Sequence, residues 1–217
     1  MPKPAGMDHD DISVRVGKVV HYLEAQARVL CNPFSDNPLL TKAFGLAHRH
    51  HFGQIRKGDL PYIIHPIEVA RMLQEEGCAD EVVAAGLLHD VLEDTGCSVE
   101  EMNKTMGARI TKIVSEVTDK DKTLSWHERK VSYLKGLACA SNDALFVACS
   151  DKTHNIESLL DGCRNSGEAF SRLFLVDLSD KVENYRQIYD LIASKIPAGK
   201  PLSRYKNCLD ELLSFKR

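Results

Sequence analysis

Four polar residues with the chemistry of metal ligands and acid–base catalysts interrupt an apolar stretch near the middle of the chain: His89, Asp90, Glu93 and Asp94. On a helix, Glu93 lies one turn beyond His89, and Asp94 lies one turn beyond Asp90, so each pair shares a face. Carboxylates this close repel one another unless a cation or solvent compensates, and a bound divalent ion would do so. The simpler interpretation is a solvated acidic helix end, which is favoured for a His-Asp pair alone because dipeptides match by chance.

Two further segments carry residue types that complete a metal site. His65 stands between an apolar run and a predicted helix start, and Asp151 follows another apolar run, with Asn155 one helical turn later. These two segments give a predicted ligand set of His65, His89, Asp90 and Asp151. Two imidazoles and two carboxylates suit Mn²⁺, Fe²⁺, Co²⁺ or Zn²⁺ and leave positions open for water and substrate on a six-coordinate ion. Because thiolates do not belong to the set, a closed structural zinc site is disfavoured.

The order of these motifs resembles the HD superfamily of metal-dependent phosphohydrolases. Longer strings, spread over about residues 39 to 162, resemble the hydrolase domain of RelA/SpoT proteins and its standalone branch, the small alarmone hydrolases, which includes the metazoan SpoT homologue. The matching strings are Ala47-His48, Gly53-Gln54, Arg56-Lys57, Pro61-Tyr62-Ile63, His65-Pro66, His89-Asp90, Glu93-Asp94-Thr95, Val117-Thr118, and Asp151 with His154-Asn155. Several motifs in the right order make a chance match improbable.

This resemblance implies an all-helical enzyme that binds one Mn²⁺ per chain and removes the 3′-pyrophosphate from guanosine tetra- and pentaphosphate. It implies that His65, His89, Asp90 and Asp151 are the metal ligands. Glu93 and Asp94 would handle the attacking water. General chemistry agrees, because a divalent ion lowers the pKa of a bound water towards ~7, and a neighbouring carboxylate can accept its proton.

The resemblance also implies substrate contacts. Asn155 would position the water or the substrate, Arg56 and Lys57 would face the nucleobase, and Lys122 would contact a phosphate. The chain departs from the family pattern at three places: Thr153 replaces a leucine, Glu157 replaces a common basic residue, and Gly58 comes one residue early. The last two departures leave the base preference open.

Several functions therefore remain in competition. The leading hypothesis is hydrolysis of (p)ppGpp, with the adenine alarmone (p)ppApp or the 2′-phosphate of NADPH as alternative substrates of the same fold. A general HD nucleotidase acting on mononucleotides is a second enzyme class, disfavoured by Glu93-Asp94-Thr95 and Arg56-Lys57. A non-enzymatic alarmone-sensing module is disfavoured because a sensor needs no water-activating carboxylate. In each case the predicted partner is a small-molecule nucleotide.

Other histidines have structural explanations. His48, His50 and His51 lack a carboxylate near them in the sequence, so we expect them on the surface or in packing. His154 lies three residues after Asp151, and we expect it to support a ligand through its ring N–H rather than bind the ion itself.

The elements that must position these residues are helices. Ser98 and Ser125 each precede a glutamate by three residues, which predicts two capping boxes, and Asp80 is a predicted cap. Apolar spacing and helix breakers predict helices over about 12–30, 39–52, 65–77, 80 onward, after each capping box, 142–160, 168–192 and 204–215. We predict an all-α HD-domain bundle of about ten helices. Residues 1–37 would form an arm and helix, 38–195 the hydrolase domain, and 196–217 a C-terminal helix packed on it.

Composition fits this class. The chain has 217 residues, 43% of them hydrophobic, enough for one compact domain. A net charge of −3 argues against a long basic surface for nucleic acid. Seven cysteines, an odd number without CxxC spacing, predict reduced thiols in a cytoplasmic protein. No apolar run approaches the ~20 residues that span a bilayer, so we expect no membrane association. The oligomeric state stays open.

Overall fold

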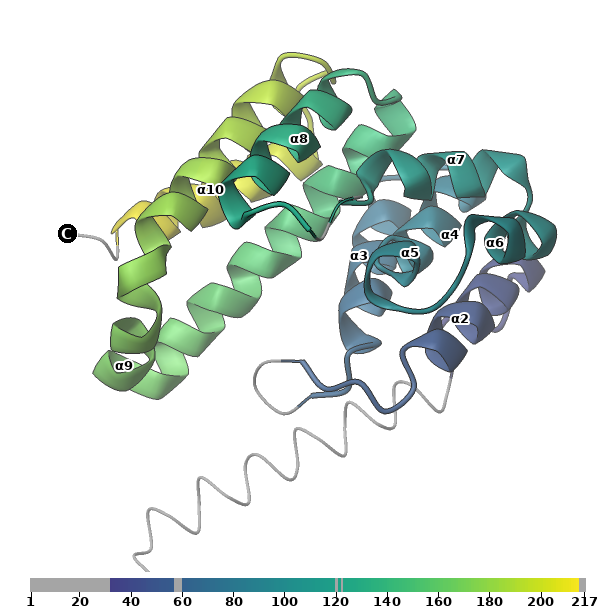
Figure 1. Ribbon diagram of the computed structural model, residues 1–217, viewed down its shortest axis with the longest axis horizontal. Helices are drawn as coiled ribbons and strands as arrows, with labels where there is room; N and C mark the ends of the chain where they lie inside the picture. Colours follow the sequence, from purple (N-terminus) through teal and green to yellow (C-terminus); the bar gives the residue numbers. More distant parts are fainter. Residues whose placement is uncertain (1–31, 57–59, 120, 122, 215–217) are drawn as a thin grey trace, which may run out of the picture.

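The computed structural model describes residues 32–56, 60–119, 121 and 123–214, with side chains for all of these except 165–178 and 200. Within this part of the chain there are nine α-helices and a single isolated β-bridge, between Ile55 and Pro61 (Figure 1). The helices are α2 (Pro38–His50), α3 (Ile64–Glu75), α4 (Asp80–Leu88), α5 (Val91–Asp94), α6 (Val99–Met106), α7 (Ala108–Val117), α8 (Trp126–Ala138), α9 (Asn142–Ala193) and α10 (Lys200–Ser214). The predicted all-α class is confirmed. The arm and helix predicted within 1–31 lie outside the described residues.

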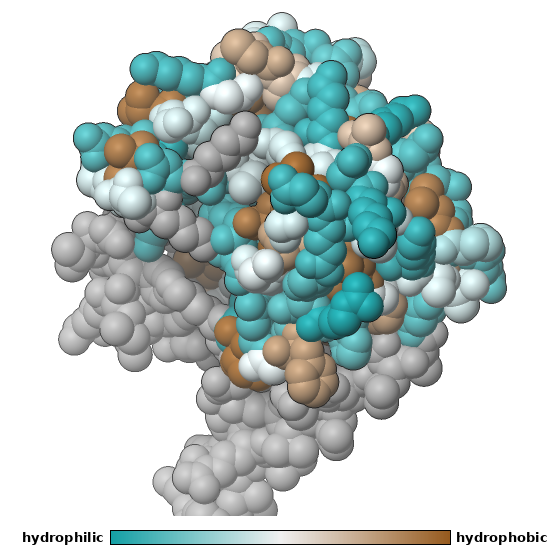
Figure 2. Space-filling view, turned by 45° about the vertical axis from the view of Figure 1, so that its right-hand side comes forward, coloured by the Kyte–Doolittle hydropathy of each residue, from teal (hydrophilic) through white to brown (hydrophobic). Residues whose placement is uncertain are grey.

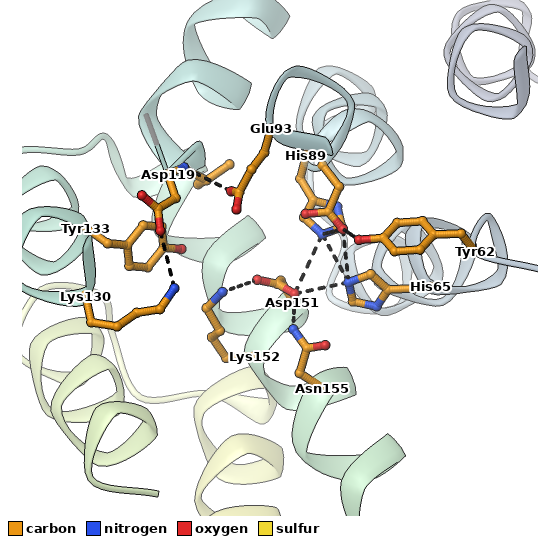
Figure 3. A pocket seen from close by; sticks show the side chains of 12 residues that line it. Tyr62, His65, His89, Glu93, Asp119, Lys130, Tyr133, Asp151, Lys152 and Asn155 are labelled. Carbon is orange, nitrogen blue, oxygen red and sulfur yellow. Dashed lines mark hydrogen bonds and ion pairs between the residues drawn. The ribbon is translucent and has the colours of Figure 1, made fainter. Parts of the chain in front are cut away.

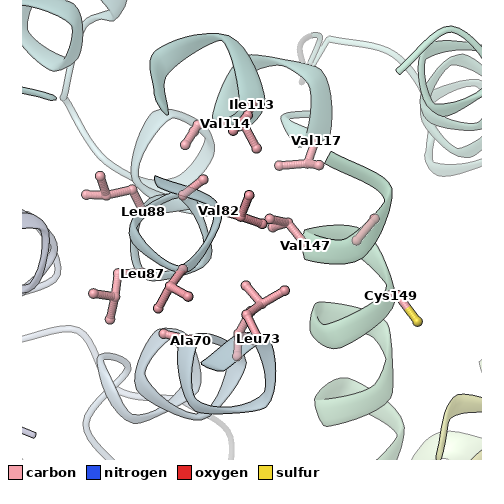
Figure 4. Packing of buried hydrophobic residues seen from close by; sticks show 14 of the residues in the cluster. Ala70, Leu73, Val82, Leu87, Leu88, Ile113, Val114, Val117, Val147 and Cys149 are labelled. Carbon is pink, nitrogen blue, oxygen red and sulfur yellow. The ribbon is translucent and has the colours of Figure 1, made fainter. Parts of the chain in front are cut away.

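Helix α4 lies at the centre of the core. Its sequence is apolar around the whole circumference after the first two residues, which is the pattern of a fully buried helix, and everything from Val82 to Leu88 is buried. It packs against α2, α3, α7 and α9. Figure 4 shows side chains of α3, α4, α7 and α9 meeting here, including Leu73, Leu87, Val114 and Val147. Because α4 is fixed on all sides, the residues that follow it, His89 and Asp90, are held firmly in the interior.

Gly86 sets the distance between α3 and α4. A Cβ added there would lie 2.5 Å from Cδ1 of the buried Leu73 and 3.6 Å from the Ala70 backbone. We expect Gly86→Ala to lower the free energy of unfolding by about 1–3 kcal/mol, since overpacking outweighs the better helix propensity of alanine. Gly45→Ala is the matched control, because it is mid-helix on α2 with open space around it, and it should stabilise by up to ~1 kcal/mol. Urea unfolding of both variants measures the difference; equal effects would contradict the close approach at Gly86.

Helix ends follow the sequence in part. The capping box at Ser125 is confirmed, because its hydroxyl and the Glu128 carboxylate each bond the other residue's backbone N–H. At Ser98 only half of the box forms. Ser98 Oγ accepts from the Glu101 N–H at 3.1 Å, while the Glu101 carboxylate contacts His50 instead of the Ser98 backbone N–H. The prediction that Asp80 caps α4 is wrong. Ala79 occupies that position, and Asp80 is the first helical residue, where its charge still favours the helix dipole.

Helix α9 is one helix of 52 residues where the sequence predicts two. The chain between the two predicted helices contains glycines but no proline, so no backbone donor is removed and the hydrogen bonding continues. Figure 1 shows the axis of α9 turning sharply near its label, so that its second part runs back towards α8 and α10. Helix α10 packs on α9 and begins four residues earlier than predicted, because Pro201 is accommodated in its first turn.

The surface is mixed in character. Figure 2 shows a face on which hydrophilic side chains predominate and hydrophobic ones are scattered. Among the described helices, none combines the length and the apolar character needed to cross a bilayer.

Candidate active site

The four predicted ligands come together in the interior. His65 lies in the first turn of α3, His89 and Asp90 join α4 to α5, and Asp151 lies on α9. The two imidazole Nε2 atoms are 3.1 Å apart. Asp151 Oδ1 lies 3.2 Å from His65 Nε2 and 3.6 Å from His89 Nε2, and Asp90 Oδ2 lies 3.6 and 3.1 Å from the same atoms. Figure 3 shows His65, His89 and Asp151 pointing toward one another.

The chain breaks its helix at the His-Asp pair, which the sequence did not predict. Helix α4 ends at Leu88 and the four-residue α5 begins at Val91. The one-turn relation of Asp90 to Asp94 persists, since the Asp94 N–H donates to the Asp90 carbonyl at 2.8 Å. The Tyr62 hydroxyl bridges their carboxylates, 2.7 Å from Asp90 and 3.1 Å from Asp94. Burial and the Asp90 carboxylate raise the pKa of Tyr62, so its proton stays available to these oxygens.

Each imidazole is oriented through its second nitrogen. His89 Nδ1 lies 2.8 Å from the Gly86 carbonyl, an acceptor, so Nδ1 carries the proton and Nε2 presents a lone pair to the cluster. His65 Nδ1 lies 2.7 Å from His154 Nδ1, and their rings are stacked. Burial lowers the pKa of His154 to about 3, so His154 is neutral and can accept the His65 proton. His154 therefore lies behind His65, as expected, but it accepts a hydrogen bond there, whereas we expected it to act through its own ring N–H.

We expect His154→Ala to weaken metal binding by about 10- to 100-fold, the usual effect of losing a residue that orients a ligand imidazole. Without it the buried His65 Nδ1–H loses its acceptor and the ring loses its stacking partner. Titration of the metal-free protein with Mn²⁺ measures the change. His154→Gln, whose amide oxygen can accept the same proton, should recover part of the affinity. An unchanged dissociation constant in the alanine variant would show that His65 needs no such support.

The donor set fits a divalent cation. Burial lowers the pKa of His65 to about 4, which keeps its imidazole neutral as metal binding requires. The pKa of His89 is raised well above its ordinary value, because the Asp90 and Asp151 carboxylates outweigh the opposing effect of burial. The two carboxylates therefore favour a positive charge beside the imidazoles, which a bound cation can supply in place of a proton on His89. We conclude that the site suits a divalent metal ion held by nitrogen and oxygen donors.

A cavity of about 180 Å³ opens beside the ligands (Figure 3). Its wall is almost entirely polar or charged: Tyr62, His65, His89, Asp90, Glu93, Val117, Asp119, Lys130, Tyr133, Asp151, Lys152 and Asn155. The predicted Glu93 and Asn155 are in this wall, next to the ligands. An anionic substrate could thus meet carboxylates, lysines and the metal-ligand cluster in one space.

Glu93 is a partly buried carboxylate in the cavity wall. Its Oε2 accepts a hydrogen bond from the Asp119 backbone N–H at 3.0 Å, which fixes the side chain at the cavity wall. Burial raises the pKa of Glu93, although the Asp119 N–H acts in the opposite direction. A carboxylate with a raised pKa is a stronger base than a solvated one. Asp94 is absent from the described wall of the cavity. Its carboxylate, like that of Asp90, accepts a hydrogen bond from the Tyr62 hydroxyl.

Four wall residues were missed by sequence reasoning: Asp119, Lys130, Tyr133 and Lys152. Lys152 pairs with Asp151 and lies 4.9 Å from the centre of the Tyr133 ring. Although burial acts to lower the pKa of Lys152, the Asp151 carboxylate holds it well above its ordinary value. Lys130 pairs with Asp119 at 3.3 Å. Lys152 could have been found as the neighbour of a predicted ligand. Lys130 and Tyr133 lie on α8 outside every motif, so the sequence carries no signal for them.

The predicted substrate residues divide into two groups. Arg56 donates to Asn155 Oδ1 at 2.6 Å, and the Asn155 amide donates to Asp151, so these side chains connect the loop before α3 to the metal-ligand cluster. Lys57 and Lys122 lie outside the described residues.

The neighbouring histidines mostly pack, as expected. His48 stacks on Phe44 and contacts the edge of Phe52, and His51 stacks on Tyr62. The expectation that no carboxylate accompanies these histidines is wrong for His50, whose Nε2 lies 3.1 Å from Glu101 Oε1. Residues 50 and 101 are far apart in the sequence and meet only in the fold.

Comparison with known proteins agrees with this architecture. Residues 43–173, more than half of the chain, match the family model for the HD domain, so the chain belongs to the HD domain family. The guanosine-3′,5′-bis(diphosphate) 3′-pyrophosphohydrolase MESH1 of Homo sapiens is 42% identical over 129 residues, covering 58% of this chain and 72% of that protein. A solved structure described as a metazoan orthologue of SpoT that hydrolyses ppGpp has a TM-score of 0.64 and 27% identity, covering 83% of this chain and 96% of that chain.

Longer relatives share only this region. The guanosine-3′,5′-bis(diphosphate) 3′-pyrophosphohydrolase of Aquifex aeolicus (strain VF5) is 36% identical over 122 residues, which cover 55% of this chain and 18% of that protein. The chain therefore spans most of the compact relatives and less than a fifth of the long one. The predicted resemblance to RelA/SpoT-type hydrolase domains is confirmed.

Proposed function

We propose that this protein is a Mn²⁺-dependent hydrolase that removes the 3′-pyrophosphate from guanosine tetra- and pentaphosphate. The observation that carries the proposal is the position of Glu93 in the wall of a cavity shared with the cluster of His65, His89, Asp90 and Asp151. The names of the compact relatives support the choice of substrate. The activity would reside in residues 38–195, with 196–217 packed on the same domain. The described cysteines are free thiols, in keeping with a cytoplasmic site of action.

Several residues in and beside the cavity would have tasks in this reaction. His65, His89, Asp90 and Asp151 would hold one Mn²⁺, which when bound lowers the pKa of a water and stabilises charge on phosphate oxygens. Glu93 would orient the attacking water and accept its proton, with Asp94 as the second carboxylate nearby. Lys130 and Lys152 place two ammonium groups on the same cavity, where they can stabilise negative charge on the departing pyrophosphate. Asn155, anchored by Arg56, would position the water or the substrate.

Arg56 and Lys57 would govern the choice of substrate, since a guanidinium can stack on a purine and donate to its acceptor edge. We expect Arg56→Ala to raise KM about tenfold to a hundredfold, which corresponds to the ~1–3 kcal/mol typical of a lost buried polar contact. Metal content should stay unchanged. Steady-state kinetics with ppGpp and ppApp measure KM and base preference together. A variant with unaltered KM and a collapsed kcat would instead assign Arg56 to the reacting phosphate, through Asn155.

The test of the function is a panel of nucleotides with Mn²⁺ added: ppGpp, ppApp, NADPH and mononucleotides, with the products identified. The proposal requires that ppGpp be converted to GDP and pyrophosphate with the highest kcat/KM. Preference for ppApp or release of phosphate from NADPH would move the protein to one of the alternative substrates. Mononucleotide turnover alone would make it a general nucleotidase, and tight alarmone binding without any product would make it a sensor.

A further inference from the structure

A second cluster of metal-ligating side chains lies outside the candidate active site. His50 ends α2, Cys97 lies in the loop after α5, and Glu101 lies on α6. Their ligand atoms all lie within 4.8 Å of one another, and His50 Nε2 is 3.1 Å from Glu101 Oε1. We propose that these three residues form a second metal site, which binds Zn²⁺ or another thiophilic divalent ion. The cluster shares no residue with the candidate active site, so the proposal stands independently of the proposed hydrolysis.

The donor types select the ion. A thiolate, an imidazole and a carboxylate together suit Zn²⁺, which accepts sulfur, nitrogen and oxygen ligands, whereas Mn²⁺ and Mg²⁺ prefer oxygen-rich sites. Bonds of about 2.0–2.3 Å in a tetrahedron separate ligand atoms by about 3.3–3.8 Å. His50 Nε2 and Glu101 Oε1, 3.1 Å apart, are close to this spacing, and the Cys97 sulfur lies within 4.8 Å of the other ligand atoms. Three protein ligands leave a fourth position open to water or to a ligand from solvent.

The loop around the cluster orients its histidine. Thr95 Oγ1 donates to the Val91 carbonyl at 2.6 Å and accepts from the Cys97 N–H at 3.2 Å. Because the Thr95 hydroxyl donates its proton to the Val91 carbonyl, its Oγ1 can only act as an acceptor towards His50 Nδ1, which lies 3.5 Å away. This favours the tautomer with the proton on Nδ1, which leaves Nε2 as the metal-binding nitrogen beside Glu101. The arrangement matches the usual support of a ligand histidine, with an oxygen behind the ring.

The cluster is accessible from one side. The Glu101 side chain is 44% exposed and that of His50 is 16% exposed, whereas Cys97 is buried. An ion can therefore enter past Glu101 and reach the sulfur. Burial and the adjacent Glu101 raise the pKa of the Cys97 thiol to about 11, so binding must displace its proton and should tighten as pH rises.

Occupancy would connect the end of α2 to a segment about fifty residues later in the sequence, which contains both Cys97 and Glu101. The ion would join the end of α2 and the start of α6 to the loop that leaves α5, the helix that carries Glu93 and Asp94. Because the folded state alone brings these ligands together, Zn²⁺ should raise the melting temperature of the protein in a concentration-dependent manner.

Cobalt distinguishes this site from the candidate active site. Co²⁺ bound by a thiolate gives a sulfur-to-metal charge-transfer band in the near ultraviolet, which a site of histidines and aspartates cannot give. We expect full-length wild-type protein to show this band, and Zn²⁺ to abolish it by displacement. Cys97→Ser should eliminate the band, and the exposed Cys139→Ser, the matched control, should retain it. Asp151→Asn, which alters the other cluster, should also retain it.

Glu101→Gln is a second variant that tests the proposal even if Cys97→Ser, at a buried position, does not fold. The Glu101 side chain is half exposed, and Ser98 caps α6 through the Glu101 backbone N–H, which the substitution keeps. Loss of this ligand should weaken Co²⁺ binding at least about tenfold. The same charge-transfer band measures the binding. A wild-type protein without the band, a band that persists in a folded Cys97→Ser, or a Co²⁺ affinity unchanged in Glu101→Gln would each overturn the proposal.

Discussion

Removal of the divalent ion should abolish turnover of ppGpp, and readdition of Mn²⁺ should restore it. The reason is that two buried imidazoles, 3.1 Å apart at Nε2, and the carboxylates of Asp90 and Asp151 bring four donors of a divalent ion together. His89→Ala removes one donor and should leave kcat below detection at ordinary Mn²⁺ concentrations. Elemental analysis should give about one Mn²⁺ per chain in the wild type and little in the variant.

The matched control is His48→Ala, which removes an imidazole from the packing of Phe44 and Phe52 rather than from the site. It should keep both the metal and the activity. Far-ultraviolet circular dichroism of both variants separates loss of the ion from loss of the fold. Full activity in excess chelator, after verified removal of the metal, would refute a metal-dependent reaction at this site.

The gathering of His65, His89, Asp90 and Asp151 at one place could be predicted from the sequence because each lies in a short polar motif. His89 and Asp90 are adjacent, and His65 and Asp151 each stand at the edge of an apolar run, so burial and polarity coincide at one residue. The helical class follows from the spacing of apolar residues, because residues three and four apart lie on one face of a helix. Helix ends were predicted less well: Ala79 and not Asp80 is the N-cap of α4, and the Asp80 carboxylate instead accepts a hydrogen bond from the Asn37 amide.

Features that depend on contacts between distant segments could not be predicted. Lys130 reaches the cavity only because α8 packs beside α9, and the sequence of α8 does not reveal that neighbour. His50 meets Glu101 and Cys97 only because α2 and α6 lie together in the fold. The continuity of α9 depends on a polar, glycine-containing segment that either a loop or a helix could accommodate. In each case the deciding energy comes from tertiary packing rather than from local propensity.

Glu93→Gln should retain Mn²⁺ and lower kcat by about 10²–10⁴-fold, the usual contribution of a general base. The substitution is nearly isosteric, and the glutamine oxygen can still accept from the Asp119 N–H that now holds Glu93 Oε2 at 3.0 Å. What it removes is the negative charge and the basicity at the cavity wall. Because Glu93 is not one of the four predicted ligands, whose carboxylate oxygens lie 3.1–3.6 Å from the imidazole Nε2 atoms, metal content should stay near that of the wild type. Single-turnover rates with ppGpp, measured beside the Mn²⁺ content, separate the two properties.

The pH profile identifies the role more closely than the rate alone. A general base acts when it is deprotonated, so wild-type kcat should fall as pH drops through the pKa of Glu93, which burial raises. The glutamine variant should lose that acid limb together with its activity. Asp94→Asn is the matched comparison, since Asp94 shares the Tyr62 hydroxyl with Asp90 and is absent from the described cavity wall. It should reduce kcat less than Glu93→Gln. If Glu93→Gln keeps wild-type kcat while Asp94→Asn loses it, the proton passes to Asp94, and the Asp119 contact serves only to pack Glu93 against the wall.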